Sequence, residues 1–395
     1  MSTVLTYTED HTLAPLEWHR RSREWCREMR ALSPIMYREE YGWLVFTYRE
    51  AAQVFSDSAT YSSEYEMSPS REQEEGRSII SMDPPRHQQL RSLLTQAFSA
   101  RTIAQMEPRI RKIADERLEK ISARGQVDFM GELAAPLPVI VIAELLGLPS
   151  EDWPLYKKWT DAQVRGMTAD PDASEQTLAY CFFQAVEQKR QRPDQSLISL
   201  LLAAEIEGKH LTQAELFSFF LTLLVAGNVT TTNLLGNAML CFSLFPESLE
   251  QLRENPALIP SAIEEILRYM SPSRVLPNDP IGSRIAKVNT ELAGRSIQKG
   301  DVVRPLIFSA NFDEQQFVEP ERFMIERRPN RHISFGHGIH FCLGAPLARL
   351  EARVVLTEML KRFSQWEILD RDHLEQVDTE LIFGVKHLPM TFQPA

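Results

Sequence analysis

A long apolar stretch between residues 212 and 244 constrains the fold of this chain most. Its first four residues, Thr-Gln-Ala-Glu at 212–215, form a capping box, and Pro246 predicts the end of the helix near Leu244. Because apolar side chains lie on nearly all sides of this helix, we expect it to be buried through the centre of the protein. A chain built around it is predicted to be mainly helical.

A polar patch interrupts this helix at mid-length. Residues 226–232 read Ala-Gly-Asn-Val-Thr-Thr-Thr, and polar side chains are costly inside a core. A buried helix usually has only a structural role. Threonine hydroxyls, however, can bond back to the preceding turn and bend a helix, so this patch is a candidate functional site.

A second unusual stretch, residues 332–344, holds Cys342 among three histidines and three glycines. A helix is predicted directly after it, with Pro346 in the first turn. The helix dipole and free amides at that position favour a thiolate and lower the cysteine pKa. Glycines would let a flat, bulky group approach the backbone.

Three interpretations of this cysteine are open. A buried structural thiol is the usual role of a lone cysteine. Zinc could be bound by His332, His337, His340 and Cys342, but there is no Cys-x-x-Cys pair and the spacings fit no common zinc site. The third interpretation is a haem iron held by the cysteine thiolate.

The pattern Phe-x-x-Gly-x-His-x-Cys-x-Gly is filled by Phe335, Gly338, His340, Cys342 and Gly344. It resembles the haem-binding loop of the cytochrome P450 family. The resemblance implies a mainly α (α+β) fold of many helices and small β-sheets, with haem b (Fe-protoporphyrin IX) between the central helix and the helix after Cys342. Cys342 would be the iron ligand, and Phe335, Gly336 and Gly344 would lie against the haem.

Residues 83–91 resemble the family's Asp-Pro-Pro-x-His-x-x-Leu-Arg helix. Asp83 is predicted to cap this helix. His87 and Arg91 share one helix face, which on its own would be an ordinary solvated face. The resemblance implies that they hold the haem propionates, together with Arg284 and His340, because arginine bonds carboxylates well.

The patch at 226–232 resembles the family's Ala-Gly-x-acid-Thr-Thr motif. Thr230 matches the threonine that contacts bound oxygen, Thr231 follows it, and Ala226 and Gly227 would lie at the haem. Val229 stands where the family has an acid. Protons must then come through water, the threonines or a substrate hydroxyl, so we expect weaker coupling of electrons to product.

Two further groups of residues are predicted from the resemblance. Glu265 and Arg268 would form the buried pair of the Glu-x-x-Arg motif, with Arg322 as its third member, although Glu-x-x-Arg alone could be a surface pair. Substrate would lie against an apolar surface. Its predicted contacts are Val225, Val229, Leu276, Pro277 and Phe383.

Composition sets the remaining limits. The 395 residues show no repeat or Gly/Ser linker, so one domain spanning 1–395 is expected. A net charge of −11 disfavours nucleic acid as a partner. The N-terminus resembles no signal peptide, and no apolar run is long enough to predict a membrane span. Four scattered cysteines fit the reducing cytoplasm.

The expected function is therefore a soluble haem-thiolate monooxygenase, expected to be a monomer. It would insert oxygen from O₂ into a lipophilic small molecule of the polyketide, terpenoid, steroid or fatty acid class. Electrons would come from a separate ferredoxin or flavodoxin with its reductase. Two alternatives stay open: a peroxide-driven or oxidative-coupling haem enzyme, favoured by Val229, and a haem-binding partner protein without catalysis.

Overall fold

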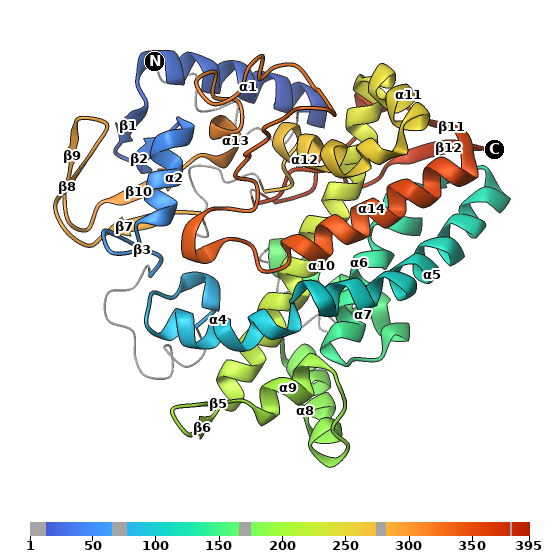
Figure 1. The fold of residues 1–395 in the computed structure, drawn as a ribbon, viewed down its shortest axis with the longest axis horizontal. Coiled ribbons are helices and arrows are strands. Elements are labelled where there is room, and N and C mark those ends of the chain that lie inside the picture. The colour runs from blue at the N-terminus through green and yellow to red at the C-terminus, as the bar shows by residue number, and fades with distance from the viewer. Residues whose placement is uncertain (1–12, 65–76, 166–174, 274–281, 380) are drawn as a thin grey trace.

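The structure is a computed structural model that describes residues 13–64, 77–165, 175–273, 282–379 and 381–395. Helices dominate it, as predicted, and the strands form small sheets (Figure 1). The α-helices are α1 Pro15–Leu32, α2 Tyr48–Ser56, α4 Arg86–Ala97, α5 Ala100–Arg124, α6 Pro136–Leu146, α7 Trp153–Arg165, α8 Glu175–Gln191, α9 Leu197–Ala203, α10 Gln213–Leu244, α11 Pro246–Glu254, α12 Ile259–Tyr269, α13 Ile307–Ala310 and α14 Ala345–Arg362.

The largest sheet has the strand order β1-β2-β10-β7-β3. Strand β10 runs parallel to β2, and the other neighbours are antiparallel. Alternate residues such as Val45 and Val303 are buried in a small hydrophobic core against α2 and α13. The strands are β1 Ile35–Arg38, β2 Gly42–Val45, β3 Tyr61–Ser62, β7 Arg284–Ala286 and β10 Val302–Pro305.

Three smaller sheets complete the strand content of the described residues. One has the order β11-β12-β4, and the other two are hairpins, β5-β6 and β8-β9. Their strands are β4 Gln126–Asp128, β5 Glu205–Ile206, β6 Lys209–His210, β8 Thr290–Leu292, β9 Arg295–Ile297, β11 Phe363–Ile368 and β12 Pro389–Pro394.

Helix α10 crosses the middle of the molecule (Figure 1). Its predicted capping box is present, since the Thr212 side chain accepts from the Glu215 amide and the Glu215 side chain accepts from the Thr212 amide. By length and composition α10 alone among the described helices could cross a membrane. It instead packs against α6, α7, α12 and α14 and buries several asparagines, which is typical of a core helix.

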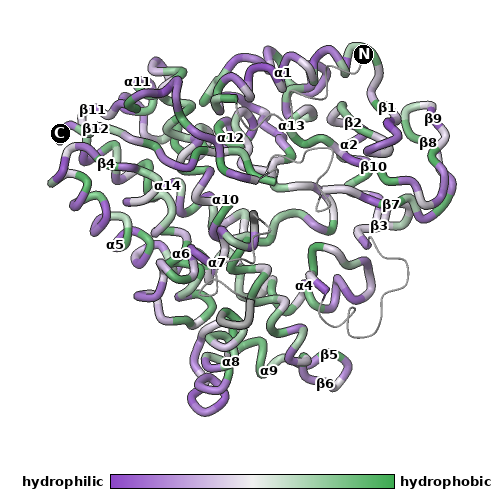
Figure 2. The backbone as a smooth tube through the Cα atoms, turned by 180° about the vertical axis from the view of Figure 1, so that it is seen from behind, coloured by the Kyte–Doolittle hydropathy of each residue, from purple (hydrophilic) through white to green (hydrophobic). Residues whose placement is uncertain are grey.

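Helix α5 lies beside α14 and is amphipathic instead. Its tube alternates between hydrophilic and hydrophobic residues (Figure 2), and its buried positions recur at helical spacing. On the polar side, Glu107 pairs with Arg353 at 2.7 Å and Asp115 pairs with Arg362 at 3.1 Å. These contacts fix α14, the helix that begins just after Cys342.

Candidate active site

The loop before α14 carries Cys342 in a defined conformation. The Cys342 amide donates to the carbonyl of Phe335 at 2.8 Å, and a short 3₁₀ turn, Gly338–His340, lies between them. Helix α14 begins at Ala345 with Pro346 in its first turn. The predicted position of Cys342, just before a helix N-terminus, is confirmed.

Two contacts hold this cysteine loop in place. Gly338 has a φ of +69°, and a Cβ at this position would lie 2.4 Å from the carbonyl oxygen of Phe55 at the end of α2. Only glycine therefore lets the loop pack so closely there. On its other side, the Ser334 hydroxyl donates to the Leu267 carbonyl at 2.7 Å, which ties the loop to α12.

The electrostatics at the sulfur differ from the expectation. The Cys342 side chain is exposed, yet surrounding protein desolvates the thiol and raises its pKa. Hydrogen bonds from the amides of Gly344 and Ala345 and the positive charges of Arg91 and Arg349 oppose this effect without overcoming it. The expected lowering of the pKa was wrong in sign because desolvation outweighs the helix terminus.

His87 and His340 lie together, with ring centroids 4.2 Å apart. Burial lowers the pKa of His87 to about 4 and that of His340 to about 3, so both rings are neutral at pH 7. Both nitrogens of His87 and Nε2 of His340 are buried without a hydrogen-bond partner. Such orphaned groups are rare in a finished core and indicate a missing polar partner.

Two arginines lie near these histidines. The charges of Arg91 and Arg284 both contribute to the low pKa of His340. A guanidinium nitrogen of Arg91 donates to the carbonyl of Phe341, and the guanidinium of Arg284 lies 5.2 Å from the ring centroid of Phe55. The structure thus brings together His87, Arg91, Arg284 and His340, the four residues predicted to hold carboxylates.

Asp83 does not cap the helix that carries His87. That helix begins at Arg86, and the Asp83 carboxylate instead accepts from the Ser63 amide at 2.9 Å and from Lys287 at 3.1 Å. The predicted cap was wrong because these tertiary partners take the carboxylate away from the helix amides.

The polar patch of α10 is partly accessible. Thr230 is half-buried, and its hydroxyl donates to the Ala226 carbonyl at 2.6 Å, which is the predicted back-bond to the preceding turn. Thr231 is buried. A Cβ at Gly227 would lie 3.2 Å from Ile142, so this glycine lets α10 approach α6 closely. Helix packing is therefore one reason for glycine at this position.

The predicted substrate contacts have different outcomes. Val225 and Val229 are half-buried on α10. Leu276 and Pro277 lie outside the described residues. Phe383 is 2% exposed, and its ring stacks on Trp18 at 5.4 Å. The prediction for Phe383 was wrong, because its side chain belongs to the core beside α1.

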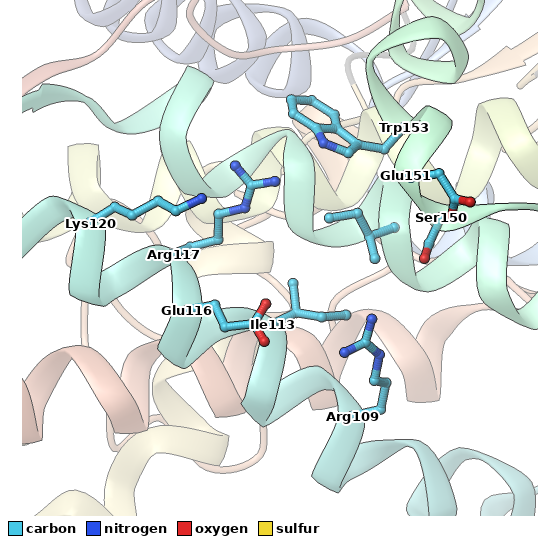
Figure 3. A pocket seen from close by; sticks show the side chains of 9 residues that line it. Arg109, Ile113, Glu116, Arg117, Lys120, Ser150, Glu151 and Trp153 are labelled. Atoms are coloured by element: carbon cyan, nitrogen blue, oxygen red, sulfur yellow. The ribbon is translucent and has the colours of Figure 1, made fainter.

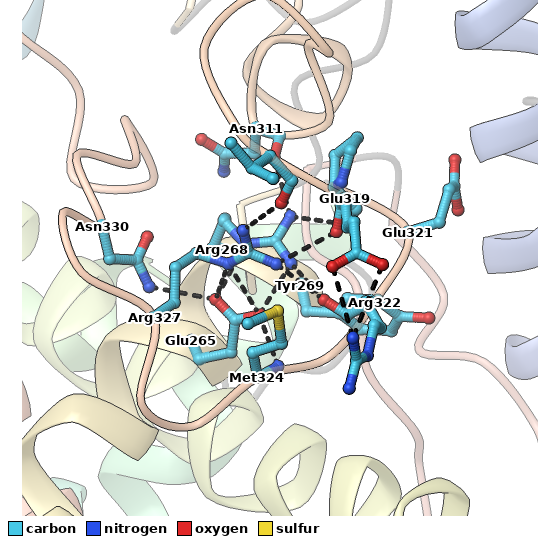
Figure 4. Close-up of polar contacts among 12 residues, drawn as sticks. Glu265, Arg268, Tyr269, Asn311, Glu319, Glu321, Arg322, Met324, Arg327 and Asn330 are labelled. Atoms are coloured by element: carbon cyan, nitrogen blue, oxygen red, sulfur yellow. Dashed lines mark hydrogen bonds and ion pairs between the residues drawn. The ribbon is translucent and has the colours of Figure 1, made fainter.

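The buried pair of α12 is confirmed as an ion pair and has a different third member. Glu265 and Arg268 are 2.8 Å apart, and both side chains are fully buried. The third member is Arg327, whose guanidinium lies 3.1 Å from Glu265 (Figure 4). The side chain of Arg322 points to Glu319, and only its carbonyl joins the network. The prediction of Arg322 was therefore wrong.

Two asparagines of this network were not predicted from the sequence. Asn330 donates to Glu265 at 3.0 Å, and the carbonyl of Asn311 accepts from Arg268 at 3.0 Å. The side chain of Asn311 also bonds Ser334 at 2.8 Å, so it connects the network to the cysteine loop. A short polar residue directly after an apolar helical turn, as in Ala310-Asn311, is the signal that could have drawn attention to it.

Cavities of similar volume occur at two places in the described part of the chain. One, of about 280 Å³, lies between α5, α6 and the start of α7, where Arg117 stacks over Trp153 (Figure 3). It contains none of the predicted site residues. The other, of about 290 Å³, is lined by Val229. In the described residues no group of three His, Cys, Asp or Glu side chains could hold a metal ion, so the zinc interpretation lacks its ligands.

Comparisons with known proteins identify the class of this site. The sequence profile of the family Cytochrome P450 matches residues 153–393. The cyclomarin C epoxidase CymV of Salinispora arenicola is 37% identical over 96% of this chain and 98% of its own. The crystal structure of the cytochrome P450 enzyme CYP109B1 from Bacillus subtilis has 41% identity and a TM-score of 0.81, and covers 93% of this chain and 98% of its own.

A second solved structure, CYP109E1 from Bacillus megaterium in complex with testosterone, is 37% identical with a TM-score of 0.83, covering 93% of this chain and 98% of its own. This chain belongs to the cytochrome P450 family, whose members are haem-thiolate oxidoreductases of the monooxygenase type.

The residues present fit such a haem. Its two propionates are carboxylates, and each neutral ring of His87 and His340 can donate one N–H, which beside the guanidiniums of Arg91 and Arg284 gives a matching set of donors. The exposed Cys342 sulfur with two amide donors fits an iron ligand.

Proposed function

We propose that this chain holds haem b through Cys342 and inserts one oxygen atom from O₂ into a lipophilic small molecule. Haem with a thiolate ligand supplies the iron chemistry that cleaves the O–O bond. The observation that carries the proposal is the Cys342 thiol, exposed between two amide donors, beside the orphaned pair His87 and His340.

The direct test is the spectrum of the purified protein. The reduced protein with carbon monoxide should show the Soret band of a haem thiolate. Cys342→Ser should abolish that band, while Cys181→Ser, at a half-buried cysteine of α8, should keep it. A wild-type spectrum without the thiolate band would contradict the proposal. A haem-containing protein that binds ligands but forms no product would favour the alternative of a haem-binding partner protein without catalysis.

Four residues would anchor the haem through its propionates. Arg91 and Arg284 would bond the carboxylates through their guanidinium groups, and His87 and His340 are neutral donors. The orphaned ring nitrogens make His87 the clearest member of this set. The backbone of Phe335, Gly336 and Gly344 would lie along the same group, because these residues flank the sulfur in the loop.

On the other side, Ala226, Gly227, Thr230 and Thr231 would form the oxygen side of the site. The Thr230 hydroxyl is accessible and holds its proton toward the Ala226 carbonyl. It would position oxygen by hydrogen bonding and pass a proton from its Oγ1. Val225 and Val229 would give the substrate an apolar surface, as would Leu276 and Pro277.

The expected substrate is a lipophilic molecule of the polyketide, terpenoid, steroid or fatty acid class. Support comes from CYP109E1, which was solved with testosterone, and from CymV, a cyclomarin C epoxidase. A spectral binding screen across these four classes, read as a spin shift of the haem, tests this expectation. A response only to polar or charged compounds would contradict it.

Electrons would come from a separate ferredoxin or flavodoxin with its reductase, in the cytoplasm. Arg349 and Arg353, candidates for meeting an acidic partner, are each paired within the chain, with Glu264 and Glu107 at 2.7 Å. Their charge is therefore partly neutralised. Reversing both charges should lower the apparent affinity for the ferredoxin if they form the docking surface, and an unchanged affinity places that surface elsewhere.

A peroxide-driven or oxidative-coupling reaction is the second candidate, and Val229 favours it. Without an acid at this position, proton delivery to O₂ is weakened, whereas hydrogen peroxide brings both protons itself. Product formation with hydrogen peroxide that exceeds formation with redox partners would make this candidate the better description.

A further inference from the structure

Residues of two helices line the cavity beside Val229. Val229, Thr232 and Asn233 line it from α10, and Lys157 and Asp161 line it from α7. The three residues of α10 have the spacing i, i+3 and i+4, which places them on one helix face. Val229, at the position of the family's acid, therefore borders the same space as the Asp161 carboxylate.

Hydrogen bonds fix these two helices next to the cavity. The side-chain amide of Asn228 donates to the hydroxyl of Thr160 at 2.5 Å, and the hydroxyl of Thr232 donates to Asn228 at 3.2 Å. Asn228 precedes Val229 and Thr160 precedes Asp161 along the chain. These buried contacts therefore hold Asp161 at a fixed place opposite Val229.

Asp161 is also accessible to water. Its side chain is 31% exposed and forms an ion pair with Lys157 one turn earlier on α7. The other two carboxylates of the lining also have partners, and neither belongs to α7, the helix that Asn228 bonds. Asp128 accepts from the Leu388 amide and from His387, both at 2.8 Å, and Asp378 pairs with Lys386 at 2.8 Å.

The size and lining of the cavity allow it to hold water, although the Asn233 oxygen itself lies against Gly384. The Asn233 side-chain nitrogen donates to the Val229 carbonyl at 2.7 Å, while its oxygen is buried without a partner. A Cβ at Gly384 would lie 1.8 Å from that oxygen, so only glycine at 384 leaves room for the Asn233 side chain. A cavity of about 290 Å³ lined by Lys157, Asp161 and Thr232 has room and polar partners for ordered water, which needs only about 10–15 Å³ of such space.

We propose that Asp161 supplies protons through water in this cavity and replaces the acid that Val229 lacks. This proposal rests on the proposed monooxygenase function. Inserting one oxygen atom of O₂ into a C–H bond consumes two electrons from the redox partner and two protons, and it releases one water. The Asp161 carboxyl passes each proton to cavity water beside Val229 and is reprotonated from solvent. Thr230, the next residue along α10, does not line the cavity and receives the proton from that water through Val229's turn of the helix. Asp161 acts through water, so it is a proton-supplying residue.

The test compares Asp161→Asn with the wild-type holoenzyme. With redox partners and O₂, product formed per NAD(P)H should fall several-fold, peroxide release should rise, and the solvent isotope effect should increase. With hydrogen peroxide as oxidant the rate should be unchanged, because that oxidant carries its own protons. Asp161→Glu should recover most of the coupling. Equal losses with both oxidants would overturn the proposal.

Lys157→Gln is the matched control, since it breaks the same ion pair but keeps the carboxylate. It should couple nearly as the wild type does. If it loses as much as Asp161→Asn, the ion pair matters rather than the acid, and the proposal fails. In a Val229→Asp background, Asp161→Asn should cost little, because the acid is then on α10 itself. A full loss in that background would also contradict the proposal.

A readout independent of activity is a crystal structure that resolves water. Ordered waters should connect the Asp161 carboxylate to the part of the cavity that Val229 lines, and a dry cavity would overturn the proposal. The proposed function and the role of Asp161 are refuted by different results. A wild-type protein without a haem-thiolate spectrum refutes the proposed function. A wild-type monooxygenase whose coupling is insensitive to Asp161→Asn refutes only the role of Asp161.

Discussion

The rings of His87 and His340 lie 4.2 Å apart, and three of their nitrogens are buried without a hydrogen-bond partner. In the protein alone this contact is unfavourable, since two neutral rings lose water and gain no bond. The pair is best explained as half of a binding site, in which a ligand's carboxylates accept the one N–H that each neutral ring can donate. Its energetic cost should be measurable in the haem-free protein.

The first prediction concerns pH and His87. Burial lowers its pKa from 6.5 to about 4, so between these values the unfolded chain binds a proton that the folded chain does not. The free energy of unfolding of the haem-free protein should therefore fall as the pH drops from 6.5 to 4, and be insensitive to this group above 6.5. Urea unfolding at pH 7 and pH 5 measures it, and His87→Gln should reduce the difference.

His373 gives a control of opposite sign. It is exposed, and its hydrogen bond to Asp370 raises its pKa, so its contribution is present at low pH and lost as the pH rises through the raised value. His373→Gln should therefore not reduce the loss between pH 7 and pH 5. Equal effects of the two substitutions would mean that His87 is not the buried titrating group.

The second prediction separates backbone strain from collision at the cysteine loop. Gly338 and Gly294 have nearly the same φ, +69° and +73°, so alanine costs about 1–2 kcal/mol at either. At Gly338 the new Cβ also meets the Phe55 carbonyl, whereas at Gly294 no described atom lies within 4 Å. Gly338→Ala should lower haem retention and stability well beyond Gly294→Ala. Equal losses, measured by haem transfer to apomyoglobin and by urea unfolding, would exclude the collision.

The third prediction concerns the buried network of Glu265. Arg327→Met removes one of its guanidinium partners inside the core and should lower the free energy of unfolding by about 3–5 kcal/mol. Arg322→Met should cost less than about 1 kcal/mol, because its ion pair with Glu319 is more than half exposed. Chemical unfolding of both variants measures these losses. A larger loss of unfolding free energy for Arg322→Met than for Arg327→Met would mean that the Arg322 side chain belongs to the network.

The fourth prediction concerns Val229 itself. Val229→Glu places an acid at the family's usual position, facing a cavity that contains polar partners. Product formed per NAD(P)H should rise and peroxide release should fall, both measured at saturating substrate. If neither changes, the missing acid does not limit coupling in this enzyme.

Local signals explain which features could be predicted from the sequence. The capping box at 212–215 and Pro346 after the cysteine loop act within a few residues, and both helices begin where these signals place them. Glu265 and Arg268 are three residues apart on one helix, so their pairing also follows from spacing.

Features that depend on distant parts of the chain were not predictable. Arg322 and Arg327 lie in a segment without regular structure, where no periodicity shows which side chain turns inward. Phe383 packs on Trp18, a residue of the first helix. The Cys342 pKa follows from desolvation by all surrounding elements, whereas the sequence shows only the adjacent helix terminus.

Asn237 of α10 attaches two distant segments of the chain to the central helix. Its side-chain amide donates at 3.1 Å to the carbonyls of Met270 and Phe383, and so fastens the segments that follow α12 and that precede β12 to the central helix. Both acceptors are main-chain atoms, so the attachment does not depend on the side chains those segments carry. Side-chain substitutions at Met270 and Phe383 that leave the main chain in place should therefore keep both attachments, whereas Asn237→Ala should release both at once.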